Sequence, residues 1–201
     1  MKKKQKITLK QTLPYILIAG SAVGILSSFI LLVENIHLLE HPTQQLVCDI
    51  NPIISCGSVM KTWQSQAFGF PNPIVGLLGF AFLGTVGLGM LAGATFKKWF
   101  WWLVQAAVTG SLAFTLWFQY ESLTSINALC PFCVLVWIVA IPMFLYTTLF
   151  VLREKYITLP KRLEVVNTFA QKQHDIILAA WYVAIVLMIL NHFWYYWQTL
   201  I

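Results

Sequence analysis

The chain has 201 residues, of which 59% belong to the hydrophobic set AVILMFWYC and only 10% are charged. Soluble globular proteins carry about 25% charged residues, so this composition excludes an ordinary soluble domain, a disordered tail and a free nucleic-acid-binding protein. The formal net charge is +6, and its meaning depends on where the basic residues lie. The length fits one unit, so we expect a single integral membrane domain over residues 1–201.

Five stretches are long and apolar enough to cross a bilayer, which needs roughly 20 mostly apolar residues in a helix. In chain order they cover about residues 13–33, 74–95, 99–119, 131–152 and 176–197. Small residues recur at helical spacing in the first two stretches and let helix backbones approach closely; they are Gly20, Gly24, Gly76, Gly79, Gly84 and Gly87. The pattern predicts an all-α membrane protein with a compact helix bundle.

The basic residues indicate the orientation of the spans. All of the 13 Lys and Arg residues except Lys61 fall before the first span, between the second and third, or between the fourth and fifth. By the positive-inside rule this places the N-terminus in the cytoplasm and the C-terminus outside. The first span is too long for a signal-peptide core and no small-x-small cleavage site follows it, so we expect it to be retained.

The longest segment between spans is the loop 34–73, which this topology places outside. Loops of this length in compact proteins are usually functional. It contains Cys48 and Cys56, while Cys130 and Cys133 lie at the outer start of the fourth span. All four cysteines are therefore expected outside, where disulfides form and persist.

The second cysteine pair forms a CxxC unit, Cys130-Pro131-Phe132-Cys133. Proline favours the first position of a helix, so Pro131 predicts Cys130 as the N-cap and Cys133 in the first turn. Free N–H groups and the helix dipole at that end stabilise a thiolate, which is the attacking species in disulfide exchange. We expect a reactive dithiol at the outer membrane boundary.

The first pair, Cys48 and Cys56, encloses seven residues. Asn51-Pro52 is typical of a turn, and Ser55 is a suitable cap for a short helix from Cys56 to about Gln64. Such a helix would lie on the bundle as a lid.

The four cysteines also fit two other kinds of site. Four thiolates can bind zinc, but a zinc knuckle has two to four residues between its cysteines. His37 and His41 are four apart, yet no further ligand accompanies them, so we expect no metal site. Two inert structural disulfides are the remaining alternative. Two pairs on one side of an otherwise cysteine-free chain favour a redox relay.

Taken together, the motifs resemble the vitamin K epoxide reductase family, in particular its bacterial, disulfide-forming branch. The matching segments are CDINPIISCGSVM at 48–60, Phe68-Gly69, Asn72-Pro73-Ile74 and the CPFC at 130–133. The likeness covers about residues 13–152. It implies a four-helix transmembrane bundle around a quinone pocket plus a fifth transmembrane helix. Several members carry a thioredoxin-like domain after the fifth helix; because this sequence stops at 201, we expect the thiol partner to be a separate protein.

The resemblance also implies roles for the four cysteines. Cys133 would lie next to the quinone, with Cys130 as its partner, and Cys48 and Cys56 would form a shuttle pair in the loop. A soluble thioredoxin-fold thiol oxidase of the DsbA type would attack through Cys48. Electrons would then pass from Cys56 to Cys130, and finally to a membrane quinone of the ubiquinone or menaquinone class.

Four further residues are candidates for the quinone pocket. Asn72 matches a family position that can bond the ring carbonyl, although it could equally be a turn residue before Pro73. Met60 and Phe68 could form pocket walls or simply pack at the interface. Trp137 stands where family members often have a tyrosine, so it could line the pocket without a hydroxyl contact.

The sequence thus predicts a quinone-dependent thiol oxidase in the bacterial cytoplasmic (inner) membrane. Two other functions remain open: a non-catalytic membrane assembly protein with two structural disulfides, and a quinone or quinone-epoxide reductase that uses the same cysteines in reverse.

Overall fold

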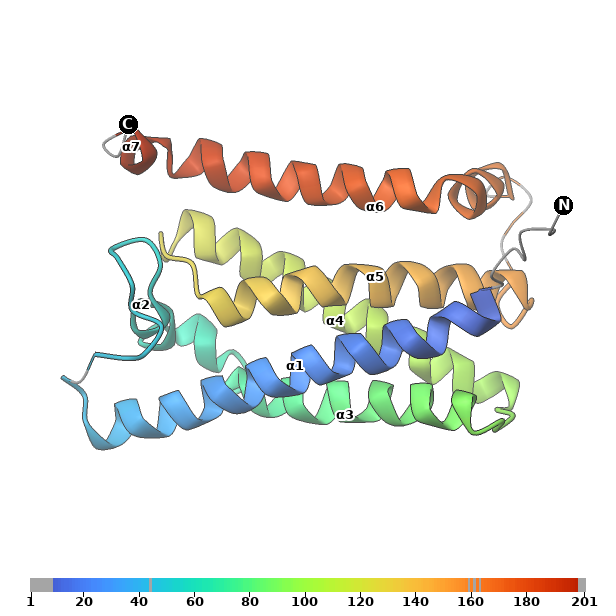
Figure 1. Ribbon diagram of the computed structural model, residues 1–201, viewed down its shortest axis with the longest axis horizontal. Helices are drawn as coiled ribbons and strands as arrows, with labels where there is room; N and C mark the ends of the chain where they lie inside the picture. The colour runs from blue at the N-terminus through green and yellow to red at the C-terminus, as the bar shows by residue number, and fades with distance from the viewer. Residues whose placement is uncertain (1–8, 44, 159, 161, 163, 199–201) are drawn as a thin grey trace, which may run out of the picture.

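The computed structural model describes residues 9–43, 45–158, 160, 162 and 164–198. Its long helices run in the order α1 (Leu9–Glu40), α3 (Asn72–Leu91), α4 (Lys98–Thr124), α5 (Pro131–Arg153) and α6 (Glu164–His192). Three short helices, α2 (Cys56–Met60), the 3₁₀ helix η1 (Trp63–Gln66) and α7 (Trp194–Trp197), lie at one end of the molecule (Figure 1). Within the described residues there is no strand beyond one isolated bridge. The five long helices are apolar enough to cross a membrane, which confirms the predicted all-α membrane protein.

The helices differ from the predicted spans mainly at their ends. Helix α1 continues to Glu40, so the loop begins at residue 41 rather than 34. Helix α3 ends at Leu91 instead of 95, and α6 starts at Glu164, well before the predicted span at 176. A non-helical residue, Gln173 (φ −120°, ψ 26°), separates the first turns of α6 from the rest. Hydropathy locates apolar segments but not helix ends, since α1 and α6 extend into polar sequence and α3 stops short of its predicted end.

Glycines set the close packing of α1 against its neighbours, as predicted. A Cβ atom at Gly20 would lie 2.6 Å from the sulfur of Met143 on α5, and one at Gly24 would collide with the ring of Phe80 on α3. Gly84 faces Ser21 of α1 in the same way. Gly79 departs from the predicted stripe, because a Cβ atom there would have no neighbouring atom within 4 Å.

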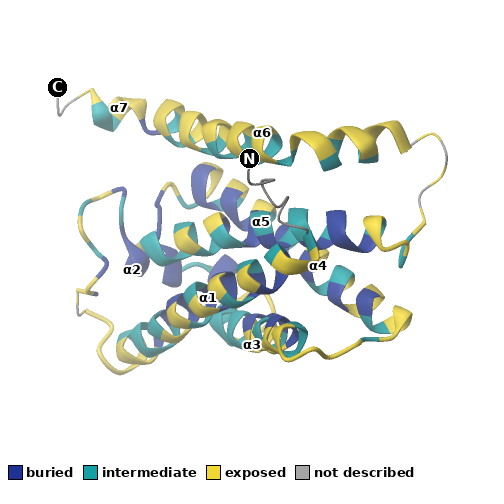
Figure 2. Ribbon diagram, turned by 45° about the vertical axis from the view of Figure 1, so that its right-hand side comes forward, coloured by how far each residue is buried: buried dark blue, intermediate teal, exposed yellow. Residues whose placement is uncertain are grey.

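Helix α6 stands beside the four-helix bundle and has no buried residue (Figure 2). Polar contacts join it to α5. The Tyr182 hydroxyl donates to the carbonyl of Ile138 at 2.7 Å. That carbonyl would normally accept from residue 142, but Pro142 has no N–H to give. An unpaired backbone group in lipid is costly, so the fifth helix compensates for the proline in α5.

The chain after α6 folds back onto the end of the bundle that carries α2. Phe193 is fully buried and belongs to a cluster with Ile53, Leu129 and Trp137. The neighbouring His192 lies 3.0 Å from the side-chain oxygen of Asn127. The aromatic end of α6 is therefore fastened to the segments that carry the cysteines.

Candidate redox site

Helix α5 positions the CxxC pair in the way its proline predicts. Pro131 occupies the first turn and Cys130 is the N-cap, with extended backbone (φ −91°, ψ 121°). The thiol of Cys130 is buried, and Cys133 lies within the first turn. Both cysteines are free thiols.

Helix α2 carries the second pair and is shorter than predicted. Ser55 caps it, accepting from the N–H of Ser58 at 3.0 Å. The helix ends at Met60 rather than Gln64, and the Thr62 hydroxyl donates to the carbonyl of Val59 at 2.7 Å. Such local side-chain bonds compete with helical ones, which explains the break before η1.

The two pairs meet at one point. Cys48 and Cys56 form a disulfide, and the sulfur of Cys56 lies 3.3 Å from the sulfur of Cys130. A short parallel bridge between Ile54 and Leu129 holds the two segments in register. Its hydrogen bonds run from Ser55 N–H to the Leu129 carbonyl (3.0 Å) and from Leu129 N–H to the Ile53 carbonyl (2.7 Å).

The carboxylate of Asp49 organises the disulfide loop. It accepts hydrogen bonds from the Ser55 hydroxyl (2.8 Å), the Gly57 N–H (2.9 Å) and the Leu46 N–H (3.1 Å). Burial alone would raise the pKa of Asp49, but these three donors together hold the pKa below its ordinary value. A Cβ atom at Gly57 would come 2.8 Å from this carboxylate, so the network requires glycine beside Cys56.

This network predicts a pH-dependent loop. Because the folded pKa of Asp49 lies below the ordinary value of about 3.9, its stabilisation is complete above that value and is lost as the pH falls through the folded pKa. We expect Asp49→Asn to lower stability at pH 7 by about 1 kcal/mol or less, since the site is half-exposed and screened. Thermal unfolding in detergent should show the gap between variant and wild type closing below about pH 4. A gap that is constant from pH 7 to pH 3 would contradict the assignment.

Hydrogen bonding also tunes the CxxC pair. The Cys133 thiol lowers the pKa of Cys130, acting against burial, and the N–H groups of Cys133 and Phe132 add to this lowering. Cys130 is thus the member of the pair that is stabilised as a thiolate, as expected for a helix N-cap. It is also the member that lies against the Cys48–Cys56 disulfide.

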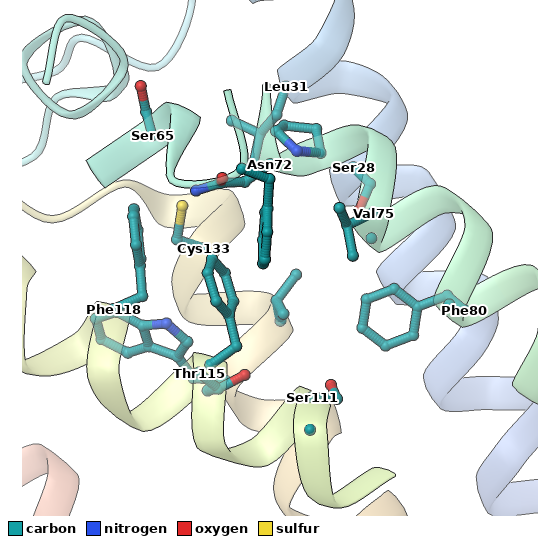
Figure 3. A pocket seen from close by; sticks show the side chains of 18 of the residues that line it. Ser28, Leu31, Ser65, Asn72, Val75, Phe80, Ser111, Thr115, Phe118 and Cys133 are labelled. Carbon is teal, nitrogen blue, oxygen red and sulfur yellow. The ribbon is translucent and has the colours of Figure 1, made fainter. Parts of the chain in front are cut away.

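A cavity of about 570 Å³ opens beside these sulfurs, between α1, α3, α4 and α5 and beneath α2. Both Cys130 and Cys133 border it. Figure 3 shows the Cys133 sulfur and the Asn72 amide directed to one part of the cavity, with Ser111 and Thr115 of α4 on another wall. No residue of α6 is among the described residues that line it.

All four predicted pocket residues border this cavity. Met60 and Trp137 are buried, whereas Phe68 is half-exposed and packs on Phe114 with 5.4 Å between ring centroids. Asn72 accepts from the Ala67 N–H (3.1 Å) and donates to the Gln64 carbonyl (2.7 Å). Asn72 is the first residue of α3 rather than a turn residue, and its side chain links the start of that helix to η1 and the residue after it.

Sequence reasoning missed most of the polar lining. Asn35, Ser28, Ser111 and Thr115 all border the cavity. A signal was present, since Ser28 and Asn35 are seven residues apart in one apolar helix and Ser111 and Thr115 are four apart in another. Polar side chains at helical spacing inside a span face the bundle interior more often than lipid.

The described residues contain no group of three His, Cys, Asp or Glu side chains that could hold a metal ion. His37 lies in the last turn of α1, and His41 is exposed just beyond it.

Comparison with known proteins adds one finding. The family model described as the vitamin K epoxide reductase family matches residues 15–148, which is more than half of the chain. No curated protein matches the sequence. The matched range contains all four cysteines and nearly all of the four helices that line the cavity, and it stops before α6. The chain belongs to the vitamin K epoxide reductase family, whose members are membrane oxidoreductases that link thiol–disulfide chemistry to quinones.

Proposed function

We propose that this protein is a quinone-dependent thiol oxidase that reoxidises a soluble thioredoxin-fold disulfide donor of the DsbA type. The observation that carries the proposal is the 3.3 Å separation between the sulfurs of Cys56 and Cys130, at the wall of a ring-sized cavity. Sulfurs at this separation can exchange bonds without rearrangement of the helices.

The proposed electron path has three steps. The partner's dithiol attacks Cys48 and leaves as a disulfide, which reduces Cys48 and Cys56 to thiols. Cys56 then attacks Cys130 of an oxidised CxxC pair, Cys133 leaves as a thiolate, and Cys48 releases Cys130 by closing the shuttle disulfide again. Finally the CxxC dithiol passes two electrons and two protons to a quinone and is left as a disulfide. The net reaction converts two thiols and a quinone to a disulfide and a quinol.

The bonding of the four cysteines corresponds to one intermediate of the proposed path. The shuttle pair is oxidised and the CxxC pair is reduced, as expected after exchange and before electron transfer to the quinone. A lowered pKa makes a thiol a better leaving group, and Cys130 is the sulfur released when Cys48 closes the shuttle disulfide. Two independent structural disulfides would not require the 3.3 Å approach of the Cys56 and Cys130 sulfurs, so this juxtaposition favours exchange between the pairs.

The cavity suits a quinone of the ubiquinone or menaquinone class. Its volume falls in the range of about 300–1,000 Å³ that is typical of small-molecule sites, and a few polar groups interrupt an apolar lining. Met60, Phe68, Asn72 and Trp137 would hold the ring beside Cys133. The bound quinone would supply the two-electron acceptor chemistry.

Charge supports the orientation of the protein that we propose for a bacterial inner membrane. Lys97 and Lys98 at the start of α4, and Arg153 at the end of α5, lie at the end of the bundle opposite to α2 (Figure 1). By the positive-inside rule that end is cytoplasmic, so the four cysteines and the C-terminus would face the outer compartment.

Quinone reduction by the purified protein tests the function. The assay supplies a reduced thioredoxin-fold oxidase and a short-chain ubiquinone or menaquinone analogue, and follows the quinone absorbance. We expect turnover by the wild type and none by Cys133→Ser, although that variant should still exchange disulfides with the partner. Turnover that survives Cys133→Ser, or shuttle disulfides that do not respond to quinone, would overturn the proposal.

A further inference from the structure

Asn35 is a buried amide in an apolar helix and is not used by the path above. It lies on α1 with 5% of its surface exposed. Its side-chain oxygen is buried and has no hydrogen-bond partner in the described part of the chain. The same side chain borders the large cavity.

An unpaired amide oxygen is costly in this setting. Burying an amide without a hydrogen bond is unfavourable, and buried polar groups in native proteins almost always have a partner. An asparagine at this position therefore indicates that something in the cavity completes its hydrogen bonding.

The side-chain amide of Asn72, on the facing helix α3, already makes two hydrogen bonds within the protein. Its oxygen accepts from Ala67 and its nitrogen donates to Gln64. It has one N–H left to donate and cannot turn over without breaking both bonds. Asn35 has no such constraint, so its amide can present either the nitrogen or the oxygen to a ligand.

Asn35 also lies at the sulfur end of the cavity. It borders a second, smaller cavity of about 280 Å³ that reaches Lys61 and Gln66, and Met60 is shared between the two. The α2 residues Val59 and Met60 line the large cavity at this end. A ring held by Asn35 would therefore lie toward the cysteines, and its apolar tail would extend toward the opposite end of the bundle.

We infer that Asn35 binds a ring oxygen of the quinone and does so in both oxidation states. The amide nitrogen donates to a carbonyl oxygen of the quinone. After reduction, the amide turns over and its oxygen accepts from a hydroxyl of the quinol. This inference rests on the proposed function, because it takes the occupant of the cavity to be a quinone.

The test measures equilibrium binding of a short-chain quinone, and of its quinol, by calorimetry in detergent. Wild type is compared with Asn35→Leu, which keeps the approximate size but removes both polar atoms. The matched control is Gln119→Leu, because Gln119 on α4 is 3% exposed and has an unpartnered amide nitrogen but does not border the cavity.

We expect Asn35→Leu to weaken binding of both quinone and quinol by about tenfold, and Gln119→Leu to leave both unchanged. The KM for quinone should rise with the dissociation constant, while the KM for the thiol partner stays constant.

Unchanged quinone affinity in Asn35→Leu would overturn the inference. If thermal stability rose at the same time, the unpaired amide of Asn35 would be a structural defect or a water site and not a quinone contact. Equal losses in Asn35→Leu and Gln119→Leu would also overturn it. Asn35-dependent binding without any turnover would instead refute the thiol-oxidase proposal alone, so the two failures are distinguishable.

Discussion

The double variant Cys48→Ser/Cys133→Ser is expected to form a disulfide between Cys56 and Cys130 quantitatively under mild oxidation with diamide. Each remaining cysteine has lost its own partner, and the two sulfurs that are left lie 3.3 Å apart in the wild-type structure. No third thiol is present to resolve the bond. Mass spectrometry of the digested protein should identify the cross-linked peptides.

The matched control is Cys48→Ser/Cys130→Ser, which leaves Cys56 and Cys133. Cys133 lies one helical turn further along α5, so it is expected to cross-link to Cys56 much more slowly. Equal rates in the two double variants would show that the segments move freely and that the observed separation does not guide exchange. The single variant Cys130→Ser should reduce turnover by on the order of 10³-fold or more, because Cys56 would have no disulfide to attack; losses of this size are seen when residues of other covalent enzyme mechanisms are removed.

Local signals in the sequence predicted the parts of the site that depend on neighbouring residues. Pro131 indicated both the start of α5 and the cap position of Cys130, and Ser55 indicated the start of α2. Hydropathy located the five long helices. These features are determined within a few residues along the chain, so one sequence contains enough information to predict them.

Features that depend on tertiary packing could not be predicted in this way. The approach of Cys56 to Cys130 depends on the bridge between Ile54 and Leu129, which are far apart in sequence. Phe193 sits in an aromatic segment typical of a membrane interface, yet it is buried against Trp137 and Leu129. Neither contact leaves a periodic pattern or a short motif, because each joins residues on separate helices and loops.

The glycines include contacts that the sequence predicted and positions that it did not. Spacing predicted close helix contacts, and Gly24 and Gly84 make them. The same spacing cannot tell a glycine that faces a helix from one that faces an empty volume. Gly79 on α3 and Gly110 on α4 are both exposed and both border the cavity, and an added Cβ atom at either would meet nothing within 4 Å. The cavity therefore opens between α3 and α4, toward the lipid.

Because the cavity opens at this place, Gly79→Leu and Gly110→Leu should each reduce quinone turnover. Either side chain would extend into the free volume and obstruct the path of a lipid-soluble quinone. We expect quinone turnover to fall by about tenfold or more in each variant, which corresponds to about 1.4 kcal/mol. Stability should not fall, since leucine is favoured over glycine in a helix by about 1 kcal/mol.

The decisive comparison is with thiol exchange, which does not use the cavity. Disulfide exchange with a reduced thioredoxin-fold partner, measured in a single turnover without quinone, should proceed at the wild-type rate in both variants. Gly84→Leu serves as the contrasting change, because a Cβ atom there would come 3.0 Å from Ser21 and disturb the contact between α1 and α3; it should lower stability and both activities together. Full quinone turnover in both Gly79→Leu and Gly110→Leu would contradict this prediction. It would mean that quinone reaches Cys133 by a route other than the opening between α3 and α4.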